Sequence, residues 1–449
     1  MLLPHSIVPG IAWPAILPPV GASMLAMQFQ LQQSQWWSPE VLRAHQLQQL
    51  AGVLRHAGEA VHFYRQRFAA SGFDPRGGFS AEAFFQLPLL TRADIQSAGN
   101  ALVANKLPPE HGKFLTFGSS GSTGQPIQVL GSEVTHFFSG ALTLRDHLWH
   151  RRDLSARLAA IRTMVESATL QGWGPATDAV YTTGPSATFS ISNDIGVQLA
   201  WLVEQNPDYL LSHPSNVLAL ARRCLETGTH IGNLREVRTF GETLPPGLRE
   251  MCQQAWGVPV TDAYSAEEVG NIALQCPSHE HYHVQAENLL VEIIDAEGLP
   301  CAPGQVGRVV ITTLHNFAMP LIRYANGDYA EAGEPCPCGR GLPVLKRIMG
   351  RQRNMLILPD GTRHWPSFPA EIWADIAPIR QIQLVQHSLR HVGVNLVIDQ
   401  PLIPEQQQRF IRALQKSLGY PFEIELRHVK QIERGANCKY EGFISMIGG

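Results

Sequence analysis

The sequence predicts an α/β fold: a large layered α/β N-terminal domain with a distorted β-barrel subdomain, followed by a small α+β C-terminal domain. Short apolar strands alternate with helical patterns between residues 157 and 240, which indicates a layered sheet with much parallel pairing. Strand patterns dominate after residue 257, which favours a second sheet or a distorted barrel. The pattern changes again near Gly350. We therefore expect an extension over 1–27, a large domain over 28–349 and a small one over 350–449.

Composition narrows the classes of function. The chain has 449 residues, of which 44% are hydrophobic and 16% charged, so it is long enough for roughly two to four domains. A formal net charge of -3 provides no field suited to nucleic acid or an anionic membrane, and no apolar run could span a bilayer. Seven cysteines are an odd number for a disulfide scaffold, so we expect a reducing, cytoplasmic compartment.

Residues 1–27 are apolar but repeatedly interrupted by proline, which predicts no helix and a poorly ordered or surface-draped extension. The segment lacks a basic n-region and an unbroken apolar core, so no signal peptide is expected. Its prolines are Pro4, Pro9, Pro14, Pro18 and Pro19. The residues Ser38-Pro39-Glu40 then indicate a helix start, and apolar positions at helical spacing continue to about Ala70.

Caps and periodicity predict the next elements. Residues 85–95 are typical of a loop followed by a short helix with Thr91 as its N-cap. Residues 132–150 are expected to form a helix that carries Phe137 and Phe138. In the C-terminal domain we expect two strands, a helix and a last strand, at 381–386, 392–398, 404–418 and 423–428.

A run of glycine and hydroxyl residues, Thr116 to Pro126, lies between two apolar segments and is therefore expected to be a strand–loop–strand turn. Such a loop can cradle phosphate oxygens with its N–H and O–H groups, although composition alone would also fit a solvated linker. It is not the P-loop of nucleotide hydrolases, because no Gly-Lys-Ser/Thr follows. The candidate phosphate-binding residues are Ser119, Ser120, Gly121, Ser122, Thr123 and Gly124.

Further polar residues follow the ends of later strands. Each has an ordinary structural interpretation, such as a helix-dipole partner, a solvated face, a turn residue or a surface lysine. Their common position at strand ends favours a shared site, because active sites of α/β proteins collect at the carboxyl ends of strands. These residues are Gly241, Glu242, Asp262, Tyr264, Glu268, Asp328, Arg351 and, near the end of the chain, Lys439.

Taken together, these segments resemble the adenylate-forming superfamily of acyl-CoA synthetases, nonribosomal adenylation domains and luciferases. The closer resemblance is to the phenylacetate–CoA ligase and capsule-biosynthesis branch. It rests on the Ser-Ser-Gly-Ser-Thr-Gly-x-Pro loop, on Leu-Pro-Leu-Leu-Thr-Arg-Ala-Asp-Ile at 87–95 and on Pro-Leu-Ile-Arg-Tyr at 320–324 followed by Gly327-Asp328. The resemblance extends from about Ser38 to Met446.

The resemblance implies roles in ATP binding. The loop from Gly118 to Gly124 would hold the phosphates. Gly241 and Glu242 would line the adenine pocket, and Tyr264 would stack on the base, with Asp262 as a further nucleotide-binding residue. Asp328 would accept hydrogen bonds from the ribose hydroxyls.

The resemblance also implies the catalytic groups. Arg351 would reach the ribose from the hinge. Glu268 would bind magnesium, which prefers hard oxygen ligands shared with phosphates. Lys439 would stabilise charge on the carboxylate and the α-phosphate as pyrophosphate leaves. In this superfamily the small C-terminal domain is mobile and rotates between the two half-reactions, so that Lys439 would act only in the first.

Three positions depart from the usual pattern. Asn437-Cys438 stands where the superfamily usually has glycine before the lysine. Glu267 replaces the usual threonine or serine before the magnesium glutamate, and Arg353 stands at the usual acidic or lysine hinge position. None of the three removes a charged group that the chemistry requires.

Cysteine and histidine residues form a second constellation. Cys276 precedes His279, His281 and His283, and Cys336-Pro337-Cys338-Gly339 follows later. Three thiols and one imidazole make a closed tetrahedral zinc set, although three unconnected cysteines and a histidine-rich loop are the alternative. The capsule-type branch often has this pattern, with His283 at the matching position. The expected structural zinc ligands are Cys276, His283, Cys336 and Cys338.

The expected function is therefore that of an ATP-dependent, AMP-forming ligase that activates an aryl or acyl carboxylic acid and transfers it to a thiol, with coenzyme A as the leading acceptor. Loading of a carrier protein and amide formation with an amine are the alternatives, and a non-catalytic adenylate-binding scaffold is a third. ATP, magnesium, coenzyme A and structural zinc are the expected cofactors, and a homodimer is the expected assembly. Phe137, Phe138 or Trp173 could line an acyl pocket, although core packing is the alternative for each.

Overall fold

The computed structural model describes residues 4–77, 80–118, 127–163, 165–368, 371–377, 379–432 and 440–447. The chain forms two compact units, and each unit is assembled from separate segments. Unit 1 contains Met1–Leu158, Ala168–Ala187 and Thr261–Ile348. Unit 2 contains Ala159–Ser167, Thr188–Val260 and Met349–Gly449. Among the described residues, no helix is both long and apolar enough to cross a membrane.

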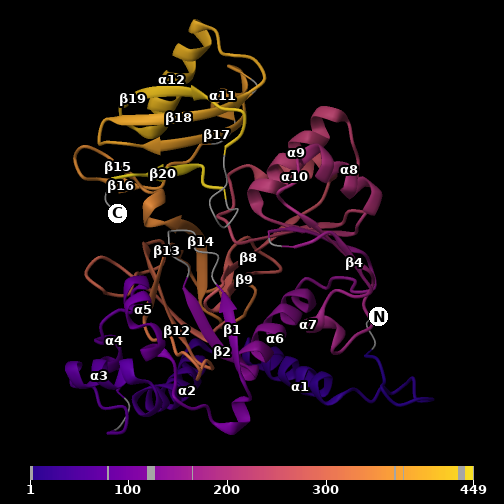
Figure 1. The fold of residues 1–449 in the computed structure, drawn as a ribbon, viewed down its shortest axis with the longest axis vertical. Helices are drawn as coiled ribbons and strands as arrows, with labels where there is room; N and C mark the ends of the chain where they lie inside the picture. The colour runs from indigo at the N-terminus through magenta and orange to yellow at the C-terminus, as the bar shows by residue number, and fades with distance from the viewer. Residues whose placement is uncertain are drawn as a thin grey trace. The chain divides into compact units, whose positions relative to one another are not determined.

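The first part of unit 1 is helical (Figure 1). Its long helices are α1 (Pro19–Ser34), α2 (Pro39–Ala60) and α6 (Glu133–Trp149). Shorter helices are α3 (His62–Ser71), α4 (Ala81–Phe85), α5 (Arg92–Ala98) and α7 (Pro175–Asp178), with 3-10 turns η1 (Gly99–Leu102) and η2 (Pro109–His111). Their buried apolar residues, including Leu50, Tyr64 and Phe84, pack with Leu290 and Tyr324 from the strands of the same unit.

The strands of unit 1 form a hairpin and a mostly antiparallel run. The hairpin pairs β1 (Phe114–Gly118) with β2 (Gln128–Ser132), so that Thr116 lies opposite Leu130. The run has the order β11-β12-β13-β14-β10-β9-β8. Its strands are β8 (Val260–Ala266), β9 (Gly270–Gln275), β10 (Tyr282–Val284), β11 (Leu289–Ile294), β12 (Val306–Thr313), β13 (Tyr324–Ala332) and β14 (Val344–Arg351). A short strand, β4 (Ala168–Leu170), also belongs to this unit.

The first part of unit 2 alternates strands and helices, as the sequence predicts for 157–240. It contains β3 (Leu158–Arg162), β5 (Ser186–Ser190), α8 (Ile195–Gln205), β6 (Tyr209–Ser212), α9 (Pro214–Thr227), β7 (Glu236–Phe240) and α10 (Leu248–Trp256). Strands β6 and β7 run parallel, with Tyr209 opposite Glu236. Helices α8, α9 and α10 lie together (Figure 1), and Val217 and Leu248 are buried against Leu210 and Val237.

The C-terminal part of unit 2 is the small α+β region. It contains η3 (Gln352–Asn354), β15 (Leu356–Ile357), β16 (Arg363–His364), α11 (Glu371–Ala374), β17 (Ile379–Gln386), β18 (His391–Ile398), α12 (Pro404–Leu418), β19 (Glu423–His428) and β20 (Phe443–Ser445). Its four-stranded sheet has the order β19-β18-β17-β20. The apolar face of α12, with Phe410 and Leu414, is buried against Leu384 and Val394 of this sheet. Together with the large sheet-containing N-terminal part, this region confirms the α/β class.

The expected caps are present. The hydroxyl of Ser38 accepts a hydrogen bond from the N–H of Val41 at the start of α2. Thr91 and Asp94 form a reciprocal capping box at the start of α5: the N–H of Asp94 donates to Thr91 Oγ1 at 3.1 Å, and the N–H of Thr91 donates to Asp94 Oδ2 at 2.8 Å. These local contacts confirm Thr91 as an N-cap.

The N-terminal extension differs from the expectation. The prediction of no helix over 1–27 is wrong from Pro19 onward, because α1 begins there. Proline is tolerated at the first helical position, where its missing N–H would have no partner in the helix. Met24 and Leu31 of α1 are buried together with Ala141 of α6. The domain boundaries at 27/28 and 349/350 stay predictions.

Candidate active site and metal cluster

Tyr264 and Asp328, two predicted nucleotide-binding residues, contact each other in unit 1. The Tyr264 hydroxyl donates to Asp328 Oδ2 at 2.8 Å. Asn326 Nδ2 donates to the same carboxylate oxygen at 2.8 Å and to the Tyr264 hydroxyl at 3.0 Å. The N–H of Asp328 in turn donates to Asn326 Oδ1 at 3.1 Å. The three polar side chains therefore orient one another, and Asn326 is a member that sequence reasoning did not select.

Asp262, on the same strand as Tyr264, has partners of its own. Tyr282 donates its hydroxyl to Asp262 Oδ2 at 2.7 Å, and the N–H of Asp262 donates to Gln275 Oε1 at 2.9 Å. Asp262 is buried. Gln275 lies on β9, the strand next to β8, and Tyr282 lies on β10, one strand further, so these bonds hold β8, the strand that carries Tyr264, to the sheet.

Glu268, the predicted magnesium ligand, lies opposite Arg92. Arg92 Nη1 and Glu268 Oε1 are 3.5 Å apart, and the two side chains are 24% and 10% exposed. Arg92 is the first residue of α5, within the Leu-Pro-Leu-Leu-Thr-Arg-Ala-Asp-Ile segment. The pair brings that segment to the glutamate, although the two residues are 176 positions apart in the chain.

Arg323 attaches the same segment to strand β13. The N–H of Leu90 donates to the carbonyl of Arg323, and the N–H of Ala325 donates to the carbonyl of Leu90, both at 2.9 Å. The Nη1 group of Arg323 donates to the carbonyls of Leu87 (2.6 Å) and Phe85. The same guanidinium makes a two-bond pair with Glu292, whose side chain is 10% exposed, at 2.9 and 3.2 Å. Burial raises the pKa of Glu292 despite the attraction of Arg323. The Pro-Leu-Ile-Arg-Tyr motif is thus a brace for the segment that carries Arg92.

In unit 2, Glu242 follows β7 directly. Gly241 has a φ of 78°, a conformation that favours glycine and turns the chain at this point. The Glu242 carboxylate accepts hydrogen bonds from two backbone N–H groups, at 3.0 Å from Ser215 in the first turn of α9 and at 2.8 Å from Tyr440. A carboxylate at a helix N-terminus is favoured by the helix dipole.

The predicted hinge residues of unit 2 are also held by specific contacts. The N–H of Arg351 donates to Asn354 Oδ1 at 3.2 Å. Arg353 makes a two-bond ion pair with Glu441, with Nε and Nη2 at 2.9 and 2.6 Å from Oε1. Asn354 Nδ2 donates to the carbonyl of Phe443 at 2.7 Å. Arg353 therefore binds a residue that follows Lys439 by two positions.

Several predicted residues lie outside the described part of the chain. They are the loop residues Ser119, Ser120, Gly121, Ser122, Thr123 and Gly124 and the catalytic candidate Lys439. Their roles stay predictions. The structure does describe the strands on either side of the loop, and their antiparallel pairing agrees with the expected strand–loop–strand turn.

The predicted zinc ligands lie together in unit 1. One donor atom each of Cys276, His281, His283 and Cys336 falls within 4.8 Å of all the others. Cys336 Sγ lies 3.8 Å from Cys276 Sγ and 2.9 Å from His281 Nε2. Cys338 Sγ lies 3.4 Å from His283 Nε2. The geometry therefore adds His281 to the expected set, and five side chains surround a position that takes four ligands in structural zinc sites.

The protonation preferences of these groups follow from burial. Burial lowers the pKa of His281 and lowers that of His283 to about 3, so both imidazoles are neutral and can ligate a metal. Burial raises the pKa of Cys276, and that of Cys336 to about 12, because a thiolate is costly in an apolar environment. Burial also opposes ionisation of Cys338, but hydrogen bonds from the Arg340 backbone and side chain lower its pKa overall. A bound cation would favour the thiolates outright, so the donor set fits zinc.

Comparison with known proteins finds relatives of both parts of the chain. Residues 363–446 match the family model of the CapK C-terminal domain. Phenylacetate-coenzyme A ligase of Thermus thermophilus is 26% identical over 356 residues, which cover 76% of this chain and 77% of the relative. Phenylacetate-coenzyme A ligase of Escherichia coli strain K12 is 25% identical over 363 residues, which cover 77% and 78%.

Solved structures share the fold. A crystal structure of 2-hydroxyisobutyryl-CoA ligase in the postadenylation state matches with a TM-score of 0.69 at 20% identity and covers 90% of this chain and 89% of that chain. The anthranilate CoA ligase AuaEII with anthranoyl-AMP matches with a TM-score of 0.54 at 17% identity, over 73% of this chain and 64% of the other. Sequence motifs, fold and relatives agree: the chain is similar to phenylacetate–CoA ligases over about three quarters of its length, matches the CapK family in its C-terminal part, and has the fold of acid–CoA ligases.

Proposed function

We propose that this enzyme activates an aryl or acyl carboxylic acid with ATP and transfers the acyl group to the thiol of coenzyme A. The observation that carries the proposal is the Tyr264–Asn326–Asp328 triangle, where an aromatic ring for a base and a carboxylate for ribose hydroxyls hold each other in place. The phenylacetate–CoA ligase relatives support coenzyme A over a carrier protein or an amine as acceptor.

In the first half-reaction a carboxylate oxygen of the acid attacks the α-phosphorus of ATP. The bond to the pyrophosphate oxygen breaks, and an acyl-adenylate forms. Tyr264 and Asp328 would bind base and ribose, Arg351 would contact the ribose, and Gly241 and Glu242 would line the adenine pocket. These interactions would orient the α-phosphate for attack, which lowers the entropic part of the barrier.

The remaining assignments concern charge. The loop from Gly118 to Gly124 would retain the leaving pyrophosphate, and Lys439 would stabilise the negative charge that develops at the α-phosphate. Glu268 would hold magnesium, which when bound would neutralise negative charge on the phosphates. In the second half-reaction the thiol attacks the acyl carbon and AMP leaves.

The Cys/His cluster would hold a structural zinc ion with ligands drawn from Cys276, His281, His283, Cys336 and Cys338. A closed four-ligand site has no position for substrate, so its role would be to stabilise the fold. A zinc-to-protein ratio near zero in protein purified without chelator, and after incubation with zinc, would refute this assignment. The cytoplasmic location and the homodimer stay predictions.

The test is ATP–pyrophosphate exchange with a panel of aryl and acyl carboxylic acids, followed by AMP formation with coenzyme A. We expect exchange with at least one acid and AMP release that requires coenzyme A. Lys439→Ala should abolish exchange but retain thioester formation from supplied acyl-adenylate, whereas Lys416→Ala, on the exposed face of α12, should affect neither. No exchange with any acid contradicts the proposal, and AMP release that depends on an amine or a carrier protein corrects the acceptor.

A further inference from the structure

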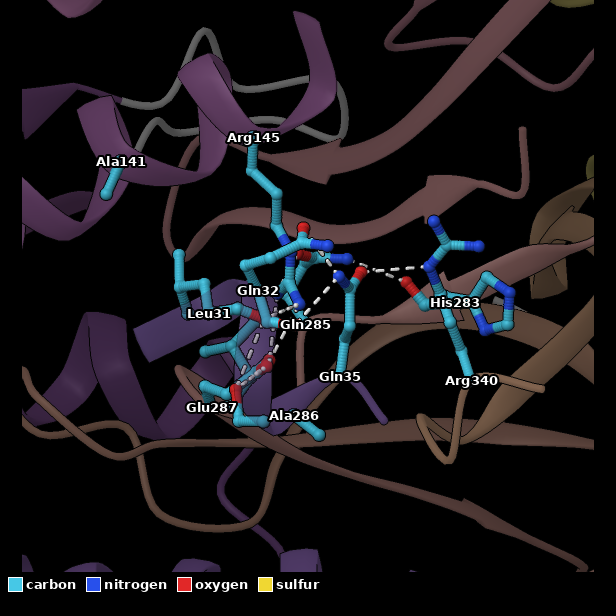
Figure 2. A network of polar contacts seen from close by, with 12 residues as sticks. Leu31, Gln32, Gln35, Ala141, Arg145, His283, Gln285, Ala286, Glu287 and Arg340 are labelled. Carbon is cyan, nitrogen blue, oxygen red and sulfur yellow. Dashed lines mark hydrogen bonds and ion pairs between the residues drawn. The ribbon is translucent and has the colours of Figure 1, made fainter. Parts of the chain in front are cut away.

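Arg340 connects the Cys/His cluster to the end of helix α1. Its Nη1 donates to Cys338 Sγ at 3.4 Å, and its Nε donates to Gln35 Oε1 at 2.9 Å. Gln35 is the C-cap residue of α1, and its Nε2 donates to Gln32 Oε1, one turn back, at 2.7 Å. Figure 2 shows Arg340 and Gln35 directed toward each other, with His283 beside Arg340. One guanidinium thus contacts both a cluster thiol and the helix end.

Aromatic contacts strengthen this connection. The Arg340 guanidinium carbon lies 4.8 Å from the ring centre of Trp36 and 4.6 Å from that of Trp149, the last residue of α6. Arg145 contacts the same Trp149 ring at 4.7 Å. Such cation–π contacts add to the hydrogen bonds when the charge is partly desolvated. Arg340 therefore bridges the chain just after α1 and the end of α6.

The backbone after Arg340 approaches the same segment closely. The N–H of Gly341 donates to the carbonyl of Gln35 at 2.9 Å. A Cβ atom at position 341 would collide with the carbonyl oxygen of Trp37, so only glycine fits here without displacement. The cysteine loop and the α1–α2 junction therefore have little freedom to move independently.

A second path connects the cluster to α1 through Arg145. Arg145 Nη2 donates to the carbonyl of Leu31 at 3.1 Å and to Glu287 Oε1 at 3.0 Å. The hydroxyl of Ser34 donates to the same Glu287 oxygen at 2.6 Å. Arg145 Nη1 also donates to Gln285 Oε1 at 3.0 Å, and Gln285 Nε2 donates to the carbonyl of His283 at 3.0 Å. Figure 2 shows this buried network between α1, α6 and the His283–Glu287 segment.

We propose that metal occupancy of the Cys/His cluster and docking of the C-terminal half of α1 are coupled, with Arg340 as the coupling residue. The inference rests on the proposed metal site. A bound ion would fix the Cys336–Gly341 loop and hold Arg340 against Gln35 and the two indoles, as groups around metal ligands commonly do. Coupling between two sites is reciprocal. If a bound metal strengthens α1 docking by a given factor, loosening the α1 contacts would weaken metal binding by the same factor.

The experiment uses full-length protein, loaded with zinc or stripped with a chelator, and measures two quantities. Hydrogen–deuterium exchange over residues 19–37 reports α1 docking, and competition with a chromophoric chelator reports zinc affinity. We expect zinc to slow exchange over 19–37 by roughly 5- to 10-fold, the lower range of coupling between sites. Arg340→Ala should abolish this protection and weaken zinc binding by a similar factor.

Two variants sharpen the test. Gln35→Ala removes one bond to Arg340 but keeps both indole contacts, so it should give a smaller loss of the same kind and serves if Arg340→Ala does not fold. Arg55→Ala, an exposed arginine in α2, is the matched control and should change neither quantity.

The outcomes separate this inference from the metal proposal. If zinc binds but leaves exchange over 19–37 unchanged, and Arg340→Ala binds zinc with unaltered affinity, the coupling is refuted and the metal site stands. If no zinc binds, both are refuted.

Discussion

The hydroxyl of Tyr264 donates a 2.8 Å hydrogen bond to Asp328 Oδ2, which joins two residues that are 64 positions apart and stand on different strands. Asn326 Nδ2 reaches the same oxygen atom. Two neutral donors at one carboxylate oxygen hold the group in a single orientation. The pair is therefore suited to present a preorganised acceptor to vicinal hydroxyls, which is the role proposed for Asp328 with the ribose of ATP.

Removing either partner should weaken ATP binding to different degrees. Asp328→Ala removes a charged acceptor, for which hydrogen bonds contribute about 1.5–3 kcal/mol, so the KM for ATP should rise about 10- to 100-fold. Tyr264→Phe keeps the ring and one donor to Asp328, so the rise should be about fivefold. Pyrophosphate exchange at varied ATP measures both, with Tyr420→Phe as the control. Equal KM values for wild type and Asp328→Ala would contradict the ribose role.

Arg92 and Glu268 should affect the magnesium requirement in opposite directions. Glu268→Gln removes the charge proposed to ligate the ion, so half-maximal adenylation should need at least about tenfold more magnesium. Arg92 Nη1 lies 3.5 Å from the same carboxylate and would compete with a bound ion for it. A partly exposed pair contributes up to about 1 kcal/mol, so Arg92→Ala should lower the requirement about two- to fivefold. A shift in the same direction for both variants would argue against Glu268 as a ligand.

Removing one member of the Arg323–Glu292 pair should destabilise the protein more than replacing both members with apolar residues. Arg323→Ala leaves the Glu292 carboxylate, which is only 10% exposed, without its arginine partner, and breaking such a largely desolvated pair typically destabilises a protein by about 3–5 kcal/mol. Arg323→Met combined with Glu292→Leu leaves neither charge and should be less destabilising than Arg323→Ala. Thermal and urea unfolding measure the differences. A double variant that is less stable than Arg323→Ala would contradict this account.

Glu287 should confer a stability that acid removes. Burial alone would raise its pKa, but attraction and hydrogen bonds from Arg145, with a bond from Ser34, lower it below the usual 4.5. A lowered pKa means that the contribution is present above about pH 4.5 and is lost as the pH falls through the lower, folded-state value. Glu287→Gln should therefore be less stable than wild type at pH 7, and the gap should narrow below pH 4.5. Unfolding temperatures across pH 7 to 3 measure this, and a constant gap would contradict it.

Arg353 and Glu441 should influence the first half-reaction more than the second. Their two-bond contact holds the residue two positions after Lys439 to the hinge. Because the pair is partly exposed, we expect Arg353→Ala to slow pyrophosphate exchange only about three- to tenfold and to spare thioester formation from supplied acyl-adenylate. The exchanged pair Arg353→Glu with Glu441→Arg should restore part of the loss. Equal slowing of both half-reactions would indicate a general structural role instead.

Local signals in the sequence predicted local structure well. Thr91 and Asp94 are close in the chain, so their capping box could be read directly. The helix predicted at 404–418 coincides with α12, because its apolar residues recur at helical spacing around a proline start. The start of α1 is not evident from the sequence, because Pro19 is both the last of a series of prolines and the first residue of the helix.

Long-range pairing could not be predicted from one sequence. Arg92 meets Glu268 from 176 residues away, and no periodicity points from one to the other. His281 is different: it stands two residues before His283, and alternate residues of an extended segment face the same side. That spacing was sufficient to include His281 among the metal ligands. The phosphate loop and Lys439 lie outside the described residues, so the sequence remains their basis.

The Arg145–Glu287 pair cannot form until well after Arg145 has been synthesised. Arg145 leaves the ribosome 142 residues before its partner. At about 5–20 residues per second, α6 must persist for roughly 7 to 30 seconds without the carboxylate that neutralises its arginine. Slow codons placed before position 287 would lengthen the interval before the Arg145–Glu287 pair can form.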